Sequence, residues 1–485
     1  TQTRQLARKF ALPLSQETED DWANEILGCK ADNRRYTVVR SHLKRWMLTR
    51  LSHLDIREGS EYRKAIYRSA REVFWIRMLV MFEARQAAMW LIPRALERAK
   101  KFELTRDQIE LYLLLRQNAL LNADKSKFLH YAEELEWLER LLMAELRLRA
   151  LNEAIGIEAV ARVEITERGR KLAQEARKEA AEIFEKHKTF NTGLEYFRIA
   201  TLSAESNEDV EDLLRLCRQA EKFLGTFPHL HAPLSRGQFA IKRFRAAVAT
   251  MDFEAANKAI PDCERQFPKG RNNWFIWKEI EIFLRLREKN FAAAAQLHKE
   301  VVSEERFSSQ PEQVRQKWAY FGHYAAFALW SLNLFKPHQS SHDFSQVLKD
   351  TPVFTRDKVG FNASLLILQQ LLYAAMGNDH AMFEKGDALR QYIKRNLRGK
   401  RRSRVYAFIR TLLTLHATDF DVAKTEHLAA RHIARFHQRP DTLVDEKETF
   451  PYYMAWEWIV ELVRKSHPED QKHTGARAAS RKRSR

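Results

Sequence analysis

Glycine and proline are scarce in this sequence of 485 residues, with 14 and 12 occurrences. Folds built from many short strands need both residues in their tight turns, so this scarcity argues against a turn-rich β architecture. Hydrophobic residues nevertheless make up 45% of the chain, and 29 Phe, 13 Tyr and 11 Trp supply large side chains for a core. The composition therefore predicts long helices with short connections in a packed protein.

Cysteine is rarer still. Cys29, Cys217 and Cys263 lie far apart and are odd in number, which excludes a disulfide framework and offers no metal-ligand spacing. We interpret them as reduced, buried thiols. The chain starts Thr1-Gln2-Thr3-Arg4 without an apolar signal segment, and no apolar run reaches the length of a membrane span. Together these features predict a cytoplasmic protein.

Catalytic motifs are missing as well. The sequence contains no P-loop, nucleophile elbow, zinc-protease helix motif or dinucleotide-binding fingerprint. His427, His432 and His437 are five residues apart, a step that turns successive side chains to different sides of a helix, so they do not converge as zinc ligands do. We interpret the acidic run 445–448 as a solvated connecting loop. No metal, no cofactor and no enzymatic activity are expected.

Two consecutive helical hairpins occupy residues 236–302. Their turns match, with Asp252-Phe253-Glu254-Ala255-Ala256 in the first and Asn290-Phe291-Ala292-Ala293-Ala294 in the second. A repeated helical hairpin cannot bury its apolar face alone, so it must stack on its neighbours. The region therefore predicts an array of stacked hairpins.

These turns resemble the tetratricopeptide-repeat (TPR) class of α-solenoids. In that class the second helix starts Gly-Asp-Tyr-x-x-Ala, and an alanine-rich seam and a closing proline follow. The matching residues here are Phe253, Ala256, Cys263 and Pro268, with partial matches at Phe291 and Ala294 and at Phe420, Ala423 and Ala430. The spacing from Phe253 to Phe291 is 38 residues, longer than the family's roughly 34, so the repeats are divergent.

A second resemblance covers Asp350–Glu461. The stretches 350–354, 358–362 and 456–461 are similar to a family of uncharacterised bacterial helical-repeat proteins. This resemblance implies a helical-repeat architecture and supplies no active site.

The predicted fold is all-α, with stacked antiparallel helical hairpins forming a curved TPR-like solenoid. We divide it into an N-terminal helical region 1–110 with a basic helix 34–54, a repeat array 111–335, C-terminal repeats 336–465 and a disordered basic tail 466–485. In the basic helix, the predicted core stripe is Tyr36, Val39, Leu43, Trp46, Met47, Leu51 and Leu54.

Several local features are predicted along this array. Thr105 opens a capping box, and Ser206 and Ser309 cap the helices that follow them. A long helix 125–154 ends near Gly156, and 158–188 forms a solvated, charge-rich helix. Residues 381–396 and 422–436 each form one helix, and 451–465 forms a closing helix.

The net charge of +19 is concentrated in three segments without acidic residues. The first lies within 33–54 and contains Arg34, Arg35, Arg40, Lys44, Arg45 and Arg50. The second contains Lys394, Arg395, Arg398, Lys400, Arg401, Arg402 and Arg404. The third is the end of the tail, 471–485, with Lys472, Arg477, Arg481, Lys482, Arg483 and Arg485. Concentrated charge points to an anionic partner more strongly than evenly spread charge.

Two functions follow from these patterns. The first is a non-enzymatic scaffold or adaptor that mediates protein–protein interactions within a larger assembly. The alternative is a basic helical adaptor that binds RNA, DNA or a ribonucleoprotein particle through 34–50, 394–404 and 472–485. An anionic membrane surface is a weaker third possibility, since no amphipathic anchor with exposed aromatic residues is evident.

Overall fold

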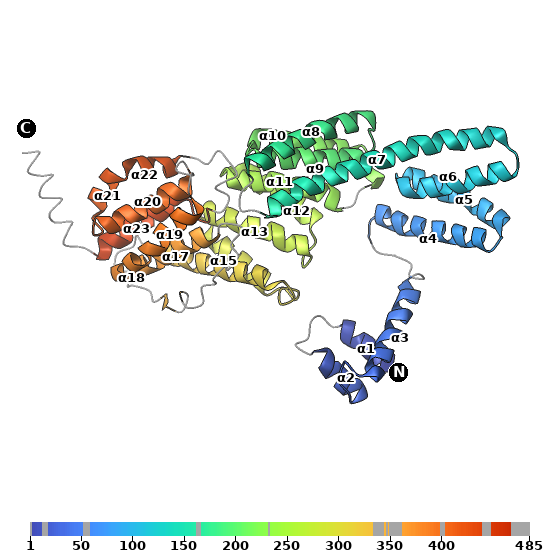
Figure 1. The fold of residues 1–485 in the computed structure, drawn as a ribbon. Helices are drawn as coiled ribbons and strands as arrows, with labels where there is room; N and C mark the ends of the chain where they lie inside the picture. Colours follow the sequence, from blue (N-terminus) through green and yellow to red (C-terminus); the bar gives the residue numbers. More distant parts are fainter. Residues whose placement is uncertain are drawn as a thin grey trace, which may run out of the picture. The chain divides into compact units, whose positions relative to one another are not determined.

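In the computed structural model the described residues are mostly helical, and many consecutive helices are joined by short turns (Figure 1). It describes residues 2–11, 18–51, 59–161, 166–230, 233–332, 344–345, 348, 361–397, 403–438 and 448–466. No strand occurs in these ranges. The predicted all-α class and the packing of consecutive helices as neighbours are confirmed.

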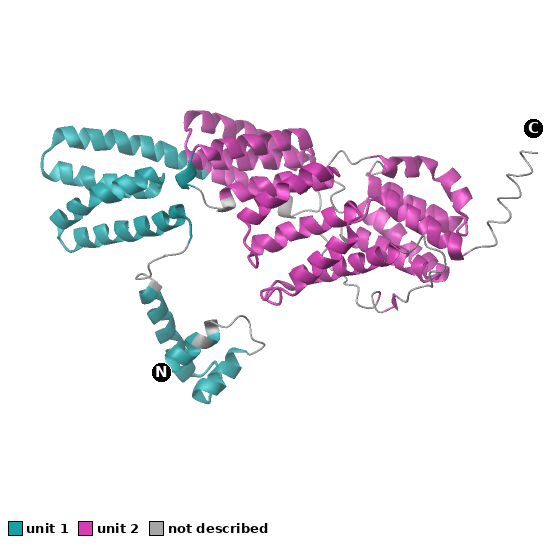
Figure 2. Ribbon diagram, turned by 180° about the vertical axis from the view of Figure 1, so that it is seen from behind, with its two compact units in different colours: residues 1–146, 227–232 teal, residues 147–226, 233–485 magenta. Residues whose placement is uncertain are grey.

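The chain divides into two compact units (Figure 2). Unit 1 comprises residues 1–146 and 227–232, and unit 2 comprises 147–226 and 233–485. The division lies inside one long helix, α7, whereas we placed the sequence-based boundaries at residues 110 and 335.

Unit 1 begins with three helices, α1 (Gln2–Ala11), α2 (Glu19–Leu27) and α3 (Arg34–Leu51), around a small core of Leu6, Ala23, Tyr36 and Leu43. The next helices are α4 (Glu61–Met81), α5 (Arg85–Lys101), α6 (Thr105–Leu121) and α7 (Lys125–Ala161). Helix α5 buries three small side chains, those of Ala88, Ala95 and Ala99. Their small size lets α4 and α6 pack closely against α5.

Unit 2 continues with the end of α7 and a series of helical hairpins. Its helices are α8 (Glu167–Lys186), α9 (Phe190–Ser206), α10 (Val210–Gly225), α11 (Pro233–Ala249), α12 (Phe253–Gln266), α13 (Asn272–Arg287), α14 (Phe291–Val302), α15 (Glu312–Ser331), α17 (Phe361–Ala375), α18 (Asp379–Glu384), α19 (Gly386–Asn396), α20 (Arg404–Ala417), α21 (Val422–Leu428), α22 (Ala430–His437) and α23 (Tyr452–Ser466). A single hydrophobic core runs from α11 to α23.

One turn geometry recurs along both units. The residue before the N-cap position has a left-handed backbone at Glu83, Glu103, Ala123, Glu208, Met251, Lys289 and Gly377. The next N–H donates to the carbonyl five residues earlier, as from Asp252 to Ala247 at 2.8 Å and from Asn290 to Arg285 at 2.9 Å. This hydrogen bond is that of a Schellman C-cap, which ends the first helix. The residue that donates it is also the N-cap of the next helix. Only one of these seven positions is a glycine, which fits the low glycine content.

The matched turns at 252–256 and 290–294 have the same cap. The Asp252 carboxylate accepts from the Ala255 N–H, and the Asn290 side-chain oxygen accepts from the Ala293 N–H, both at 3.2 Å. Asp209 caps α10 in the same way. The three N-caps are 43 and 38 residues apart, so the repeat unit is long and variable in length.

A second repeated contact joins the two helices of a hairpin. A Cβ at Gly193 in α9 would overlap the Phe223 ring of α10, and one at Gly237 in α11 would lie 2.8 Å from the Phe267 ring at the end of α12. A glycine near the start of the first helix therefore receives an aromatic ring from the end of the second.

The last helix does not simply cap the array. Residues 448–450 are buried and lead into α23, which contacts α17 and α20–α22. The Arg287 guanidinium of α13 donates to the Glu448 carbonyl at 2.7 Å, and Tyr320 of α15 hydrogen-bonds to Thr449 at 2.5 Å. The Phe450 ring lies 4.8 Å from those of Tyr324 and Trp458. This segment thus ties the C-terminal helices to elements well over one hundred residues earlier.

Several local predictions are wrong at helix ends. Thr105 is the first residue of α6 and donates its hydroxyl to Glu145 instead of capping. Ser206 ends α9 and bonds back to the Leu202 carbonyl, while Asp209 caps α10. Pro311, not Ser309, precedes α15 at the N-cap. For Thr105 and Ser206, a competing tertiary or local partner decides the role of the hydroxyl.

Helix lengths also differ from prediction. Helix α7 continues through Gly156 to Ala161, since a single glycine does not break a helix held by packing. The helix predicted at 158–188 begins at Glu167 and is not solvated all round, because Ala173, Ala176 and Ala180 are buried. Residues 381–396 and 422–436 each form two helices, which meet at Lys385 and at Ala429.

Candidate interaction surfaces

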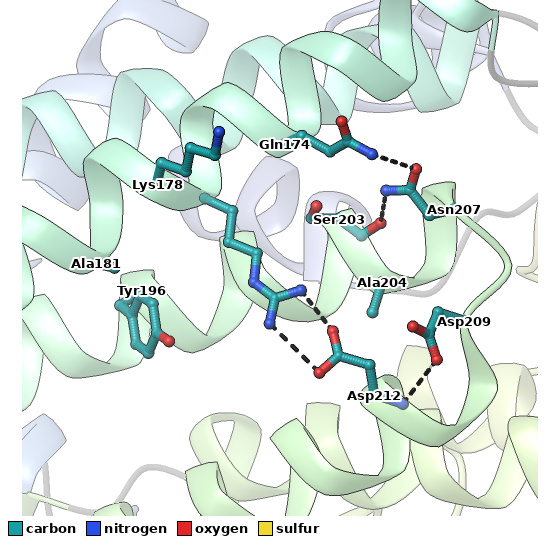
Figure 3. Close-up of a pocket in the computed structure, with 10 residues that line it drawn as sticks. Gln174, Lys178, Ala181, Tyr196, Ser203, Ala204, Asn207, Asp209 and Asp212 are labelled. Carbon is teal, nitrogen blue, oxygen red and sulfur yellow. Dashed lines mark hydrogen bonds and ion pairs between the residues drawn. The ribbon is translucent and has the colours of Figure 1, made fainter.

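A solvent-open groove of about 500 Å³ lies between α8, α9 and α10 (Figure 3). Helix α8 contributes Gln174, Arg177, Lys178 and Ala181, and α9 contributes Tyr196, Ser203 and Ala204. The turn and α10 contribute Asn207, Asp209 and Asp212. The sequence analysis did not identify this groove, because it needs three helices to come together.

Polar contacts hold one wall of the groove in place. Gln174 donates to the Asn207 side-chain oxygen at 2.9 Å, and Asn207 donates to the Ser203 carbonyl at 2.7 Å. The Arg177 guanidinium makes two hydrogen bonds to the Asp212 carboxylate, which also accepts from Arg215. Burial alone would raise the pKa of Asp212, but these two guanidinium partners outweigh it and lower that pKa.

The rest of the groove is less tightly paired. Lys178 is exposed and has no ion-pair partner among the described residues. The Tyr196 ring stacks on Phe184 at 5.1 Å, in an aromatic cluster with Phe197 and Phe223. The groove therefore offers an aromatic wall, a free ammonium group and fixed amide and carboxylate groups, which suits a peptide-like ligand.

The first basic segment lies on α3, where all six predicted cations are exposed. Tyr36 and Leu43 are buried and Val39 is half-buried, but Trp46 and Met47 are exposed, so the predicted core stripe is wrong in the second half of the helix. Arg40 pairs with Glu19 at 3.3 Å, and the Arg50 guanidinium lies 5.8 Å from the Trp46 ring. Leu51 has no described side chain, and Leu54 lies outside the described residues.

The second basic segment is split by the structure. Lys394 and Arg395 are exposed at the end of α19. Arg404 is only 2% exposed, and its guanidinium binds both carboxylate oxygens of Glu448, at 2.8 and 2.9 Å. It also donates to the Gln438 carbonyl. Arg404 is therefore a structural ion-pair partner, and its selection as a surface anion-binding residue is corrected.

The prediction for Glu448 is corrected as well, because this residue is the buried partner of Arg404. We predicted a solvated acidic loop at 445–448. Residues 445–447 lie outside the described residues, and the Glu448 side chain is buried against Arg404 and accepts from the Tyr452 N–H at 2.6 Å. Arg398, Lys400, Arg401 and Arg402 lie outside the described residues, as do Arg481, Lys482, Arg483 and Arg485 in the tail.

The buried cysteines and the buried histidine, whose side chains could in principle react, have ordinary structural surroundings. Burial raises the pKa values of Cys217 and Cys263 to about 12, so both thiols stay protonated. His416 is buried, and its Nε2–H donates to Gln370 at 3.1 Å. In the part of the chain that the structure covers, no group of three His, Cys, Asp or Glu residues could hold a metal ion.

No protein-family model and no curated protein matches this chain. Among the described helices, none combines the length and apolar character needed to cross a bilayer.

Proposed function

We propose that this chain is a non-enzymatic, cytoplasmic helical-repeat adaptor whose hairpins α9–α14 are divergent TPR-like units. The recurring Schellman-to-N-cap turns and the Gly193–Phe223 and Gly237–Phe267 contacts support this relation. Hairpin arrays of this kind bind partner peptides in the grooves between their helices.

The groove between α8, α9 and α10 carries the proposal. One of its walls is held by internal hydrogen bonds before any partner arrives, which lowers the entropy lost on binding. Lys178 is free to pair with a partner carboxylate, and Tyr196 presents a ring for packing. The expected partner is a protein segment with an acidic and an apolar residue.

The test fills the groove with one side chain. Ala181→Arg should abolish capture of a partner by the full chain in its native host, whereas Ala326→Arg, at an exposed site in the middle of α15, should leave capture unchanged. Each capture is run with and without nuclease. Equal capture by both variants, or capture that disappears with nuclease, would contradict a protein partner in this groove.

A second candidate function rests on α3. Its second half contains Lys44, Arg45 and Arg50 beside the exposed Trp46 and has no acidic residue. Cations displace counterions from phosphates, and an exposed aromatic ring stacks on unpaired bases. Single-stranded RNA is therefore the anionic partner that fits this helix best.

The test of this candidate is the salt dependence of RNA binding. Changing Lys44, Arg45 and Arg50 together to Gln should reduce the slope of log affinity against log salt by roughly 2, at about 0.7 per phosphate contact. The matched control changes three other cations to Gln, namely Arg140, Lys188 and Lys258, which are exposed but paired with neighbouring carboxylates. An unchanged slope in the α3 variant would exclude this surface.

A further inference from the structure

Unit 1 exposes large apolar side chains at one end of its helices. Because α4 to α7 alternate in direction, the α4–α5 turn and the α6–α7 turn lie at the same end (Figure 1). The exposed fractions there are 72% for Met81, 73% for Phe82, 82% for Trp90 and 63% for both Leu120 and Leu121. Leu129, one turn into α7, is 51% exposed. We call these six residues the apolar end.

This exposure is unusual for a folded protein. Single exposed leucines are common, but a group that includes a nearly fully exposed tryptophan marks an interaction surface. The side chains come from two connections and from the helical turns beside them. All six residues therefore lie within about two helical turns of that end.

Cations flank the apolar end. Arg85 follows Phe82 closely, and Lys125 and Lys127 follow Leu121. Asp124 is already paired with Lys127 at 2.8 Å, while Arg85 and Lys125 have no ion-pair partner in the described part of the chain. Over 77–90 and 116–129 together there are five basic and two acidic residues.

We propose that the apolar end inserts into the headgroup region of an anionic lipid bilayer. Tryptophan favours that region because its ring is amphipathic, and phenylalanine, methionine and leucine reach the acyl chains below. The flanking Arg85 and Lys125 then lie at the level of anionic headgroups, where each adds attraction. This inference goes beyond the proposed adaptor function and does not depend on the α8–α10 groove.

The experiment is flotation of the full chain with phosphatidylcholine vesicles, with or without phosphatidylserine. The wild type should float with the anionic vesicles and only weakly with the neutral ones. Changing Phe82, Trp90 and Leu121 together to Ser should lower binding by about tenfold or more, since these side chains supply the inserted area. Arg85→Gln with Lys125→Gln should remove the preference for phosphatidylserine.

The matched control is Trp137→Ser with Met143→Ser, which removes exposed apolar side chains from α7 away from the apolar end and should bind as wild type does. Circular dichroism checks that every variant stays helical. The inference is overturned if the wild type does not float, or if the apolar-end variant floats like the wild type. It is also overturned if sedimentation shows that these residues instead join two copies of the chain or hold a protein partner.

Discussion

At the scale of the residue, burial decides which charges are available to a partner. Arg404 belongs to the most basic stretch of the sequence, yet its guanidinium donates its hydrogen bonds to Glu448 and to the Gln438 carbonyl. The cations of α3 are all exposed. Counting charges along the sequence cannot separate these two situations, because the partner of Arg404 is 44 residues away.

The buried ion pair should be important for stability. Glu448→Gln leaves the Arg404 charge uncompensated in the interior and should lower the free energy of unfolding by about 3 to 5 kcal/mol. Urea denaturation of unit 2 measures this loss. The control Glu185→Gln, also in unit 2, removes an exposed pair with Lys188 and should change stability by less than about 1 kcal/mol. Similar effects in both variants would contradict the structural role of the buried pair.

His416 should make stability depend on pH. Burial, together with repulsion from Arg390, lowers the pKa of this histidine to about 4 in the folded protein. The unfolded state therefore binds the proton first, and stability is lost as pH falls from 6.5 to 4, by about 3 kcal/mol. His416→Gln removes this contribution, so its unfolding free energy should fall less between pH 7 and pH 4. If the unfolding free energies of the wild type and the variant change with pH in parallel, His416 is not the source of the pH dependence.

At the scale of the element, two short-range devices define the hairpins. The first is the left-handed residue that joins consecutive helices, and the second is the glycine that receives an aromatic ring. The matched turns were recognisable in the sequence, because Asp or Asn at the N-cap followed by an aromatic residue and Ala recurs. The left-handed residues were not, since six of the seven are not glycine.

The left-handed turn predicts a stabilising substitution. Ala123 has a φ of 53° and is exposed, so Ala123→Gly relieves backbone strain without removing a contact. The gain should be about 0.5 to 1 kcal/mol after the added entropy of the unfolded chain. Thermal unfolding of unit 1 measures it. The control Ala87→Gly, inside α5, should instead destabilise by a similar amount.

The glycine contact predicts the opposite effect. Gly193→Ala places a methyl group against the Phe223 ring and should destabilise the α9–α10 hairpin by about 1 to 3 kcal/mol. Gly156→Ala is the control, because no atom lies within 4 Å of its added Cβ and the helix should gain stability. Hydrogen exchange across α9 and α10 locates the loss. Unchanged exchange in Gly193→Ala would show that the ring moves freely.

At the scale of the whole molecule, the C-terminal segment holds unit 2 together. Residues 448–450 contact α13 and α15, and the Trp458 ring of α23 lies 6.0 Å from Phe291 and 5.3 Å from Phe327. An open solenoid has contacts only between neighbouring repeats. This unit adds long-range contacts, so its C-terminal half should unfold cooperatively with α13–α15.

A pair of truncations tests this coupling. Ending the chain at residue 447 should speed hydrogen exchange in α13, α14 and α15, even though these helices lie well over one hundred residues earlier. Ending it at residue 466 keeps α23 and should leave their exchange unchanged. If the shorter chain keeps full protection in α13–α15, the C-terminal segment is only a local cap.

The sequence by itself determined the all-α class, the positions of most helices and the matched turns at 252 and 290, because helical periodicity, N-caps and turn residues act over a few residues. Only the tertiary structure decided the groove between α8 and α10, the burial of Arg404 and Glu448, the return of α23 to the middle of unit 2 and the apolar end of unit 1. Each of these depends on which distant helices meet, and local periodicity contains no information on that choice.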